Sequence, residues 1–207
     1  MKVKLIAHTS LTPEFINELQ NMECMYWEPK TIDQKINHRA AVALTAIRTC
    51  YSPNKPTEIL AKEGERYFGK DASDGEGGTD ADRLFRHIFR SKHTSTLEHI
   101  TYTFAVEGLS RAALAQLTRH RVGFSFSVQS QRYVRFGSDD KSGGFGYVTP
   151  PSCETNKEIE VDFNDGDPPM SSSVNEFYKN AMRASQLAYD ALRAAGVPPE
   201  DARMVLP

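Results

Sequence analysis

Three adjacent side chains that can carry a positive charge, Arg119, His120 and Arg121, stand out chemically in the sequence. They open the stretch RHRVGFSFSVQSQRYV, in which serines, glutamines and two phenylalanines precede Arg132. A guanidinium group presents a planar fork of N–H donors that matches a phosphate or an imide edge. Serine and glutamine side chains can bind the carbonyl and N–H groups of a base, and phenylalanine supplies apolar area. The stretch therefore favours a ligand that carries phosphates and flat rings.

A simpler interpretation is an exposed helix end, where positive side chains complement the helix dipole. Two further features favour a ligand site instead. Gln116 lies three residues before Arg119, so both share one face of a predicted helix. A further guanidinium group, that of Arg132, directly follows Ser130 and Gln131. The sequence thus gathers polar and cationic groups of the kind that bind a nucleotide.

The segment HTSTLEH, residues 93–99, places two histidines and a glutamate before a predicted strand. The histidines are not four residues apart, as metal ligands on one helix face would be, so we predict no metal site. We expect a turn in which the hydroxyl groups bind backbone groups. Because turns between regular elements often carry binding residues, His93 and Ser95 are candidate ligand contacts.

The three cysteines, Cys24, Cys50 and Cys153, show no pattern of a disulfide framework or a zinc site. Their number is odd, and no two of them have the C-x-x-C spacing. Cys50 is a weak candidate nucleophile, because nothing near it in the sequence lowers the pKa of its thiol.

The composition of the 207-residue chain suits one domain with a sizeable core, since 39% of its residues are hydrophobic. Its net charge of −2 argues against general nucleic-acid binding, which needs a basic excess. An RNA-binding module that stacks arginine and aromatic side chains on bases is therefore a disfavoured alternative. No signal-peptide core and no apolar run of membrane-spanning length is present, so we expect a cytoplasmic protein without a membrane partner.

Hydrophobic periodicity and turn residues predict the elements that must position these side chains. The predicted strands are residues 2–8, 99–107 and 132–136. The predicted helices are residues 36–49, 79–93, 110–120 and 172–195, followed by the start of another at Pro198. Polar and glycine-rich composition predicts loops at 53–78 and 137–172. Thr79 and Asp82 have the spacing of a capping box, and Ser110 can cap the helix that carries Gln116.

This chain resembles the flavin-dependent thymidylate synthases. Their typical signature is RHR followed, after seven or eight residues, by a serine. Here Arg121 is followed after eight residues by Ser130 and the run QRY. Other segments resemble the same family: IRTCYSP (47–53), STLEH (95–99), YTFAVEGLSRA (102–112), YVTPPS (147–152) and GVPPEDARMVLP (196–207). The combination covers most of the chain and is far more specific than any one segment.

The resemblance implies an α+β fold with a small, mostly antiparallel sheet packed with helices, in a single domain over residues 1–207. It implies a homotetramer that binds FAD where subunits meet and that converts dUMP to dTMP by reductive methylation. Methylenetetrahydrofolate would donate the carbon, and NADPH would reduce the flavin.

The resemblance also assigns site residues at matching positions. The implied flavin contacts are His93, Ser95, Arg119, His120 and Arg121. The implied nucleotide contacts are Gln116, Arg119, Ser130, Gln131, Arg132 and Arg203, with Glu200 close to the last. Among them, Arg119, Ser130 and Arg203 are the expected catalytic residues. Arginine donors can polarise the uracil carbonyls, whereas an unassisted serine hydroxyl is a weak nucleophile and would position the substrate.

The sequence departs from the family pattern at its C-terminal end. The family continues past the Leu-Pro at 206–207 with an Asn-Ala-Arg-type flavin-binding stretch and a later arginine that activates the uracil ring. We therefore expect an incomplete or split synthase, with a second polypeptide that supplies this segment. The alternative is a non-catalytic remnant of the family that binds a nucleotide or flavin.

Overall fold

The computed structural model describes residues 1–22, 37–162 and 170–207, so that Cys24 lies outside the described residues. The chain forms two compact units, one of Val3–Ala105 and one of Met1–Lys2 together with Val106–Pro207. The expected single domain over residues 1–207 stays a prediction. In the described ranges, no helix is long and apolar enough to cross a membrane.

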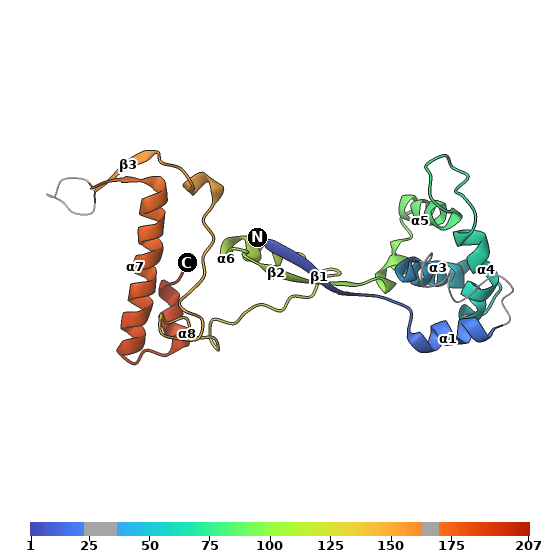
Figure 1. The fold of residues 1–207 in the computed structure, drawn as a ribbon, viewed down its shortest axis with the longest axis horizontal. Helices are drawn as coiled ribbons and strands as arrows, with labels where there is room; N and C mark the ends of the chain where they lie inside the picture. Colours follow the sequence, from blue (N-terminus) through green and yellow to red (C-terminus); the bar gives the residue numbers. More distant parts are fainter. Residues whose placement is uncertain (23–36, 163–169) are drawn as a thin grey trace. The chain divides into compact units, whose positions relative to one another are not determined.

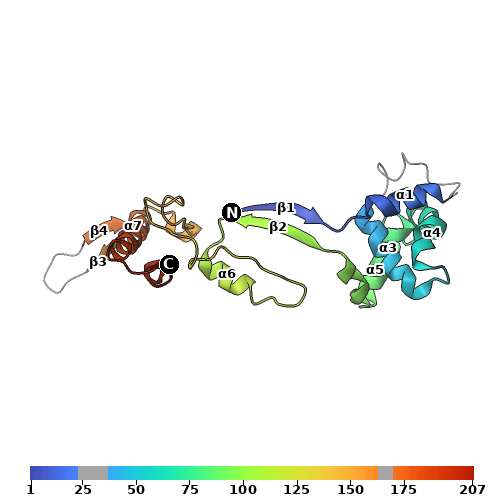
Figure 2. The ribbon, with the colours of Figure 1, turned by 90° about the horizontal axis from the view of Figure 1, so that it is seen from below.

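Strands β1 (Lys2–His8) and β2 (Tyr102–Glu107) form a two-stranded sheet and point in opposite directions (Figure 2). Both were predicted from their alternating residues. Just beyond the strands, the Thr9 N–H donates to the Thr101 carbonyl at 3.0 Å, and the two hydroxyl oxygens lie 3.0 Å apart. Almost all side chains of both strands are exposed. The sheet therefore presents apolar side chains that the rest of the described chain leaves uncovered.

Helices of the Val3–Ala105 unit pack around one apolar core (Figure 1). They are α1 (Pro13–Asn21), α3 (His38–Tyr51), α4 (Ile59–Phe68) and α5 (Asp80–Arg90). The buried residues of this core are Leu19, Ala41, Leu44, Leu60, Tyr67 and Ala81. Helix α3 confirms the helix predicted over 36–49, because its alanine- and leucine-lined face supplies part of this core.

Helix α4 lies within the stretch 53–78 that the sequence predicts as a loop, so the prediction is wrong for residues 59–68. A short 3₁₀ helix, Pro56–Glu58, leads into it. The apolar side chains of Ile59, Leu60 and Tyr67 are buried on one face together with Glu63, and the other charged residues of the helix, Lys62, Glu65 and Arg66, are exposed. The polar composition of the stretch hides this helical periodicity.

Glu63 of α4 joins that helix to the C-terminal end of α3. Its carboxylate accepts hydrogen bonds from Arg48 Nε at 2.6 Å and Asn54 Nδ2 at 2.9 Å, and also from the Ser52 hydroxyl. Burial alone would raise the pKa of Glu63, but these hydrogen bonds and the Arg48 charge outweigh it and hold the pKa below its usual range. The segment IRTCYSP thus ends α3 and fixes α4 against it.

The loop before α5 is tied to that helix. The predicted capping box is confirmed, since the Asp82 N–H donates to Thr79 Oγ1 at 3.4 Å and the Thr79 N–H donates to Asp82 Oδ2 at 2.7 Å. Arg86 of α5 reaches back and donates to both carboxylate oxygens of Asp74, at 3.0 and 2.8 Å. Gly78 has a φ of 79°, and a Cβ there would lie 2.6 Å from the Asp82 carboxylate. Glycine is therefore required at this turn.

The other unit is built on the long helix α7 (Val174–Ala194), which confirms the helix predicted over 172–195 (Figure 1). Its other elements are α6 (Arg111–Leu117), a 3₁₀ helix at Pro151–Cys153, β3 (Glu158–Val161), β4 (Met170–Ser173), α8 (Pro199–Ala202) and a 3₁₀ turn at Arg203–Val205. Strands β3 and β4 pair antiparallel, with Glu158 opposite Ser173. The predicted loop over 137–172 therefore contains short regular elements. Helices with small antiparallel sheets confirm the α+β fold class.

Side chains of α7 hold the segment that follows residue 134. The buried Tyr189 hydroxyl accepts from the Phe136 N–H at 3.2 Å, and Gln186 Oε1 accepts from the Phe145 N–H at 2.9 Å. Residues 132–134 form a turn and a bend, and residues 135–136 have no regular secondary structure, so the strand predicted there is wrong. The physical reason is that the Phe136 N–H binds a helix side chain instead of a neighbouring strand.

Candidate functional site

Helix α6 positions the first candidate residues. The Ser110 hydroxyl caps it, as predicted, by accepting from the Ala113 N–H at 3.2 Å. The helix ends at Leu117, and the next turn continues with the Arg119 N–H donating to the Gln116 carbonyl at 3.2 Å. Arg119 Nη1 also donates to Gln116 Oε1 at 3.3 Å. The structure therefore brings Gln116 and Arg119 together on one face, as their spacing indicates.

The cluster Arg119, His120 and Arg121 is exposed and electrostatically unbalanced. Within residues 1–22, 37–162 and 170–207, none of the three forms an ion pair with a carboxylate. The His120 ring lies 6.0 Å from the Phe124 ring, which is itself nearly parallel to the Phe126 ring at 6.0 Å. Cationic donors beside exposed aromatic rings can bind an anionic ligand that carries a flat ring.

Ser130 begins a turn that sets the direction of Arg132. The Ser130 hydroxyl accepts from the Arg132 N–H at 3.2 Å, and its carbonyl accepts from the Val134 N–H at 3.0 Å. Arg111 of α6 donates to the Gln129 carbonyl at 3.4 Å and so ties this turn to the helix. Ser130 and its neighbour Gln131 are half-buried. The hydroxyl of Ser130 thus has a backbone partner that fixes the turn.

Arg132, Glu200 and Arg203 form a second cluster in the same unit. Arg132 Nε donates to Glu200 Oε2 at 3.2 Å, and its Nη2 lies 3.1 Å from the same oxygen. Arg203 Nε donates to the Glu200 backbone carbonyl at 3.0 Å. Arg132 and Arg203, which the family resemblance assigns to nucleotide binding, therefore share the partner Glu200. The resemblance places Glu200 close to Arg203 only.

His93 and Ser95 belong to the Val3–Ala105 unit and are described within it. Ser95 lies in the 3₁₀ helix Thr94–His99, and Thr96 donates to the His93 carbonyl at 3.1 Å, as expected for a turn whose hydroxyls bind backbone groups. The Tyr51 hydroxyl and His93 Nδ1 are 2.8 Å apart. The contact joins residues 42 positions apart, so no local pattern in the sequence indicates that Tyr51, in the segment IRTCYSP, is a partner of His93.

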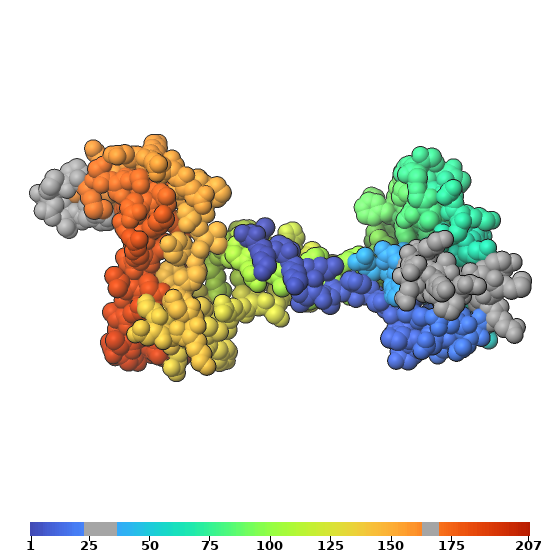
Figure 3. Space-filling model, in the orientation of Figure 1, coloured from blue at the N-terminus to red at the C-terminus, as the bar shows by residue number. Residues whose placement is uncertain are grey.

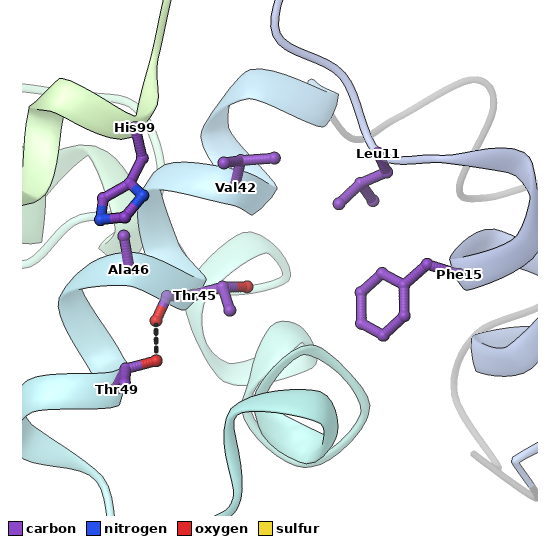
Figure 4. A pocket seen from close by; sticks show the side chains of 7 residues that line it. All are labelled: Leu11, Phe15, Val42, Thr45, Ala46, Thr49 and His99. Carbon is purple, nitrogen blue, oxygen red and sulfur yellow. Dashed lines mark hydrogen bonds between the residues drawn. The ribbon is translucent and has the colours of Figure 1, made fainter.

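A pocket of about 240 Å³ in the same unit is lined by Leu11, Phe15, Val42, Thr45, Ala46, Thr49 and His99 (Figure 4). Leu11 and Phe15 face the α3 side chains across it, and His99 lies beside Ala46 (Figure 4). The Thr49 hydroxyl donates to the Thr45 carbonyl, so its polar group is already bonded. None of the candidate site residues lines this pocket. Among the described residues, no cluster of acidic, histidine or cysteine side chains could hold a metal ion.

The sequence is similar to one family of known proteins. A family model described as thymidylate synthase complementing protein matches residues 32–207. The flavin-dependent thymidylate synthase of Geobacter sulfurreducens is 39% identical over 169 residues, which cover 81% of this chain and 58% of that protein. The enzyme of the same name from Haloarcula marismortui is 39% identical over 135 residues, covering 60% of this chain and 52% of the relative. The chain therefore spans about half the length of the curated relatives that it matches.

A solved structure resembles the whole fold. The UMP/dUMP methylase PolB from Streptomyces cacaoi, bound with 5-Br dUMP, has a TM-score of 0.53 and 20% sequence identity. The match covers 100% of this chain and 67% of that one, and it supports the fold alone. Because the family model spans most of the sequence, the chain belongs to the thymidylate synthase complementing protein family.

Proposed function

We propose that the protein is an FAD-dependent thymidylate synthase, which converts dUMP to dTMP with methylenetetrahydrofolate as the carbon donor and NADPH as the reductant. The observation that carries this proposal is the cationic cluster at residues 119–121, which forms no ion pair within the described part of the chain, followed by the turn that joins Ser130 to Arg132. The whole pattern lies within the residues that match the family. Relatives named flavin-dependent thymidylate synthase support the reaction class.

The cluster Arg119, His120 and Arg121 fits a flavin. A reduced flavin is electron-rich and tends to lose a proton, and it would supply the reducing equivalents of the reaction when bound. The three side chains offer N–H donors with no neighbouring carboxylate among the described residues, so an anionic ring system would meet no competing charge. Ser95 and His93 are proposed as further flavin contacts.

The proposed nucleotide contacts are Gln116, Arg119, Ser130, Gln131, Arg132 and Arg203. Arg119 is already bonded to Gln116, so one side chain steadies the other. Guanidinium donors from Arg119 and Arg203 would draw electron density from the uracil ring and make its ring carbon a better acceptor of hydride. The Ser130 turn would position the substrate, because its hydroxyl has no general base bonded to it among the described residues.

A homotetramer is the proposed assembly, and the exposed sheet supports it. Val3 of β1 is 54% exposed and Phe104 of β2 is 54% exposed. Figure 3 shows the N-terminal strand, in blue, at the surface. An isolated two-stranded sheet is marginally stable in water, and contiguous exposed apolar side chains are typical of protein interfaces. Burial of this sheet between subunits would stabilise the two paired strands and would remove their apolar side chains from water.

Tritium release from dUMP labelled at the ring carbon that is methylated tests the proposed reaction. The purified protein, assembled with any second polypeptide that its activity requires, is incubated with FAD, NADPH, methylenetetrahydrofolate and the labelled nucleotide. We expect release of tritium to water that requires added or bound flavin, because the ring hydrogen is replaced by a methyl group. A protein that binds dUMP and flavin but releases no tritium would instead support a non-catalytic role.

A further inference from the structure

Glu200 contacts two arginines through different groups. Its side chain accepts from Arg132, and its backbone carbonyl accepts from Arg203 Nε at 3.0 Å. Glu200 lies in the short helix α8, which begins with Pro199 and packs through the buried Ala202. The residue therefore links the turn after Ser130 to the end of the described chain within one unit.

We propose that Glu200 is a positioning residue for the nucleotide phosphate. Its carboxylate orients Arg132 so that the remaining N–H donors of that guanidinium group bind the phosphate group of dUMP. Its backbone carbonyl meanwhile holds Arg203, the arginine proposed for the uracil ring. The inference rests on the proposed function, because dUMP is the ligand that it assumes.

The geometry at Arg132 leaves one edge of the guanidinium open. Nε and Nη2 face the Glu200 oxygen, at 3.2 and 3.1 Å. The other fork, formed by Nη1 and the second Nη2 hydrogen, points away from that oxygen, and Nη1 has no hydrogen-bond partner among the described residues. The guanidinium carbon also lies 5.7 Å from the centre of the Tyr133 ring. Two contacts thus limit the orientation of a long side chain and leave a bidentate donor edge for an anion.

The ion pair between Arg132 and Glu200 contributes little to the stability of the fold. The side chains of Arg132 and Glu200 are 56% and 48% exposed. Exposed ion pairs contribute little to stability, because solvent screens them and two side chains lose freedom. A side chain that is already oriented loses less freedom when a ligand binds, so the pair favours ligand affinity. One carboxylate against two guanidinium groups also leaves the cluster positive, which suits a phosphate.

The test measures dUMP and deoxyuridine affinity by calorimetry on the purified protein supplied with FAD. We expect Glu200→Ala to weaken dUMP binding about tenfold, the effect of losing one oriented charge-assisted hydrogen bond. We expect Glu200→Gln to lose less, because its amide oxygen can still accept from Arg132. Deoxyuridine, which lacks the phosphate, should bind the variants and the unmodified protein alike. In an Arg132→Ala background, Glu200→Ala should have a much smaller effect.

Glu176→Ala is the matched control. The Glu176 carboxylate pairs with Arg183 at 3.3 Å in the same unit, and its side chain is 51% exposed. This variant should bind dUMP normally, and thermal unfolding should show that all variants remain folded.

The outcomes separate the two proposals. If the unmodified protein binds dUMP and Glu200→Ala binds it equally or more tightly, Glu200 does not position Arg132 and only the inference fails. Equal losses for dUMP and deoxyuridine would also overturn the inference, because the phosphate would not be involved. If the unmodified protein binds no dUMP, the proposed function fails and the inference fails with it.

Discussion

Arg119, His120 and Arg121 are consecutive and exposed, and none of them forms an ion pair with a carboxylate among the described residues. Neighbouring like charges repel one another, and salt screens exposed charges over about 8–10 Å. An anionic ligand removes this repulsion when it binds. These three side chains should therefore contribute a large share of the binding free energy of an anionic ligand.

Arg119→Ala should weaken the binding of both FAD and dUMP, because the residue is assigned to both ligands. The loss of a charge-assisted hydrogen bond costs about 1.5–3 kcal/mol, or roughly ten- to a hundredfold in affinity. Calorimetric titration of each ligand measures it.

Arg183→Ala is the control for that change. Arg183 is an exposed arginine of α7 that bonds Asn180 at 2.9 Å, away from the proposed contacts in the sequence. Normal affinity of Arg119→Ala for both ligands would show that the site assignment is wrong.

Local spacing predicted part of the candidate site. Gln116 and Arg119 are three residues apart, and the turn that continues past the end of α6 at Leu117 keeps them together. The contact between Arg132 and Glu200 joins residues 68 positions apart, so no periodicity could indicate it. It depends on how α8 packs against the core around Tyr189.

Helices α3 and α4 are joined by polar contacts as well as by the apolar core. Glu63 carries these contacts, and its side chain is only 11% exposed. Its pKa lies below the usual value of 4.5, because hydrogen bonds and the Arg48 charge overcome the effect of burial. A carboxyl whose folded pKa is depressed contributes stability above its unfolded pKa, and this stability is lost as the pH falls through the folded pKa.

Glu63→Gln should therefore lower the free energy of unfolding by about 1.5–3 kcal/mol at neutral pH, since Arg48 loses its countercharge. The difference between the two proteins should shrink as the pH falls below 4.5. Urea denaturation at several pH values measures both effects.

Glu58→Gln is the control, because Glu58 lies just before α4, pairs with Lys62 at 2.7 Å and has a side chain that is 29% exposed. It should change stability little. A Glu63→Gln variant as stable as the unmodified protein at neutral pH would contradict the role given to Glu63.

Sequence predicted elements where local signals were strong. Thr79 and Asp82 predicted the start of α5, and their capping box is present. Helix α4 was not predicted from the sequence, because its many exposed charged residues give the segment the polar composition of a loop. The sequence predicted α7 as a helix over 172–195, but its alanines at 181, 184 and 191 are exposed. Periodicity identifies a face of a helix but not what covers it.

The exposed sheet of β1 and β2 is the surface through which we expect the proposed homotetramer to assemble. Phe104→Lys should dissociate the proposed homotetramer, because a charge would have to be buried where subunits meet. Light scattering coupled to size-exclusion chromatography measures the mass.

Phe89→Lys is the matched control, since Phe89 is a 69% exposed phenylalanine on helix α5. It should leave the mass unchanged. An unmodified protein with the mass of one chain would contradict the proposed assembly.

Binding of FAD and dUMP by the same protein is the central expectation for the whole molecule. The most direct measurement is the visible absorbance of protein-bound FAD during titration with dUMP, with deoxyuridine as a reference. We expect the protein to retain flavin, and we expect dUMP to change its spectrum saturably and at lower concentration than deoxyuridine. A protein that retains no flavin, or whose flavin spectrum does not respond to dUMP, would contradict a shared site built on the cluster at residues 119–121.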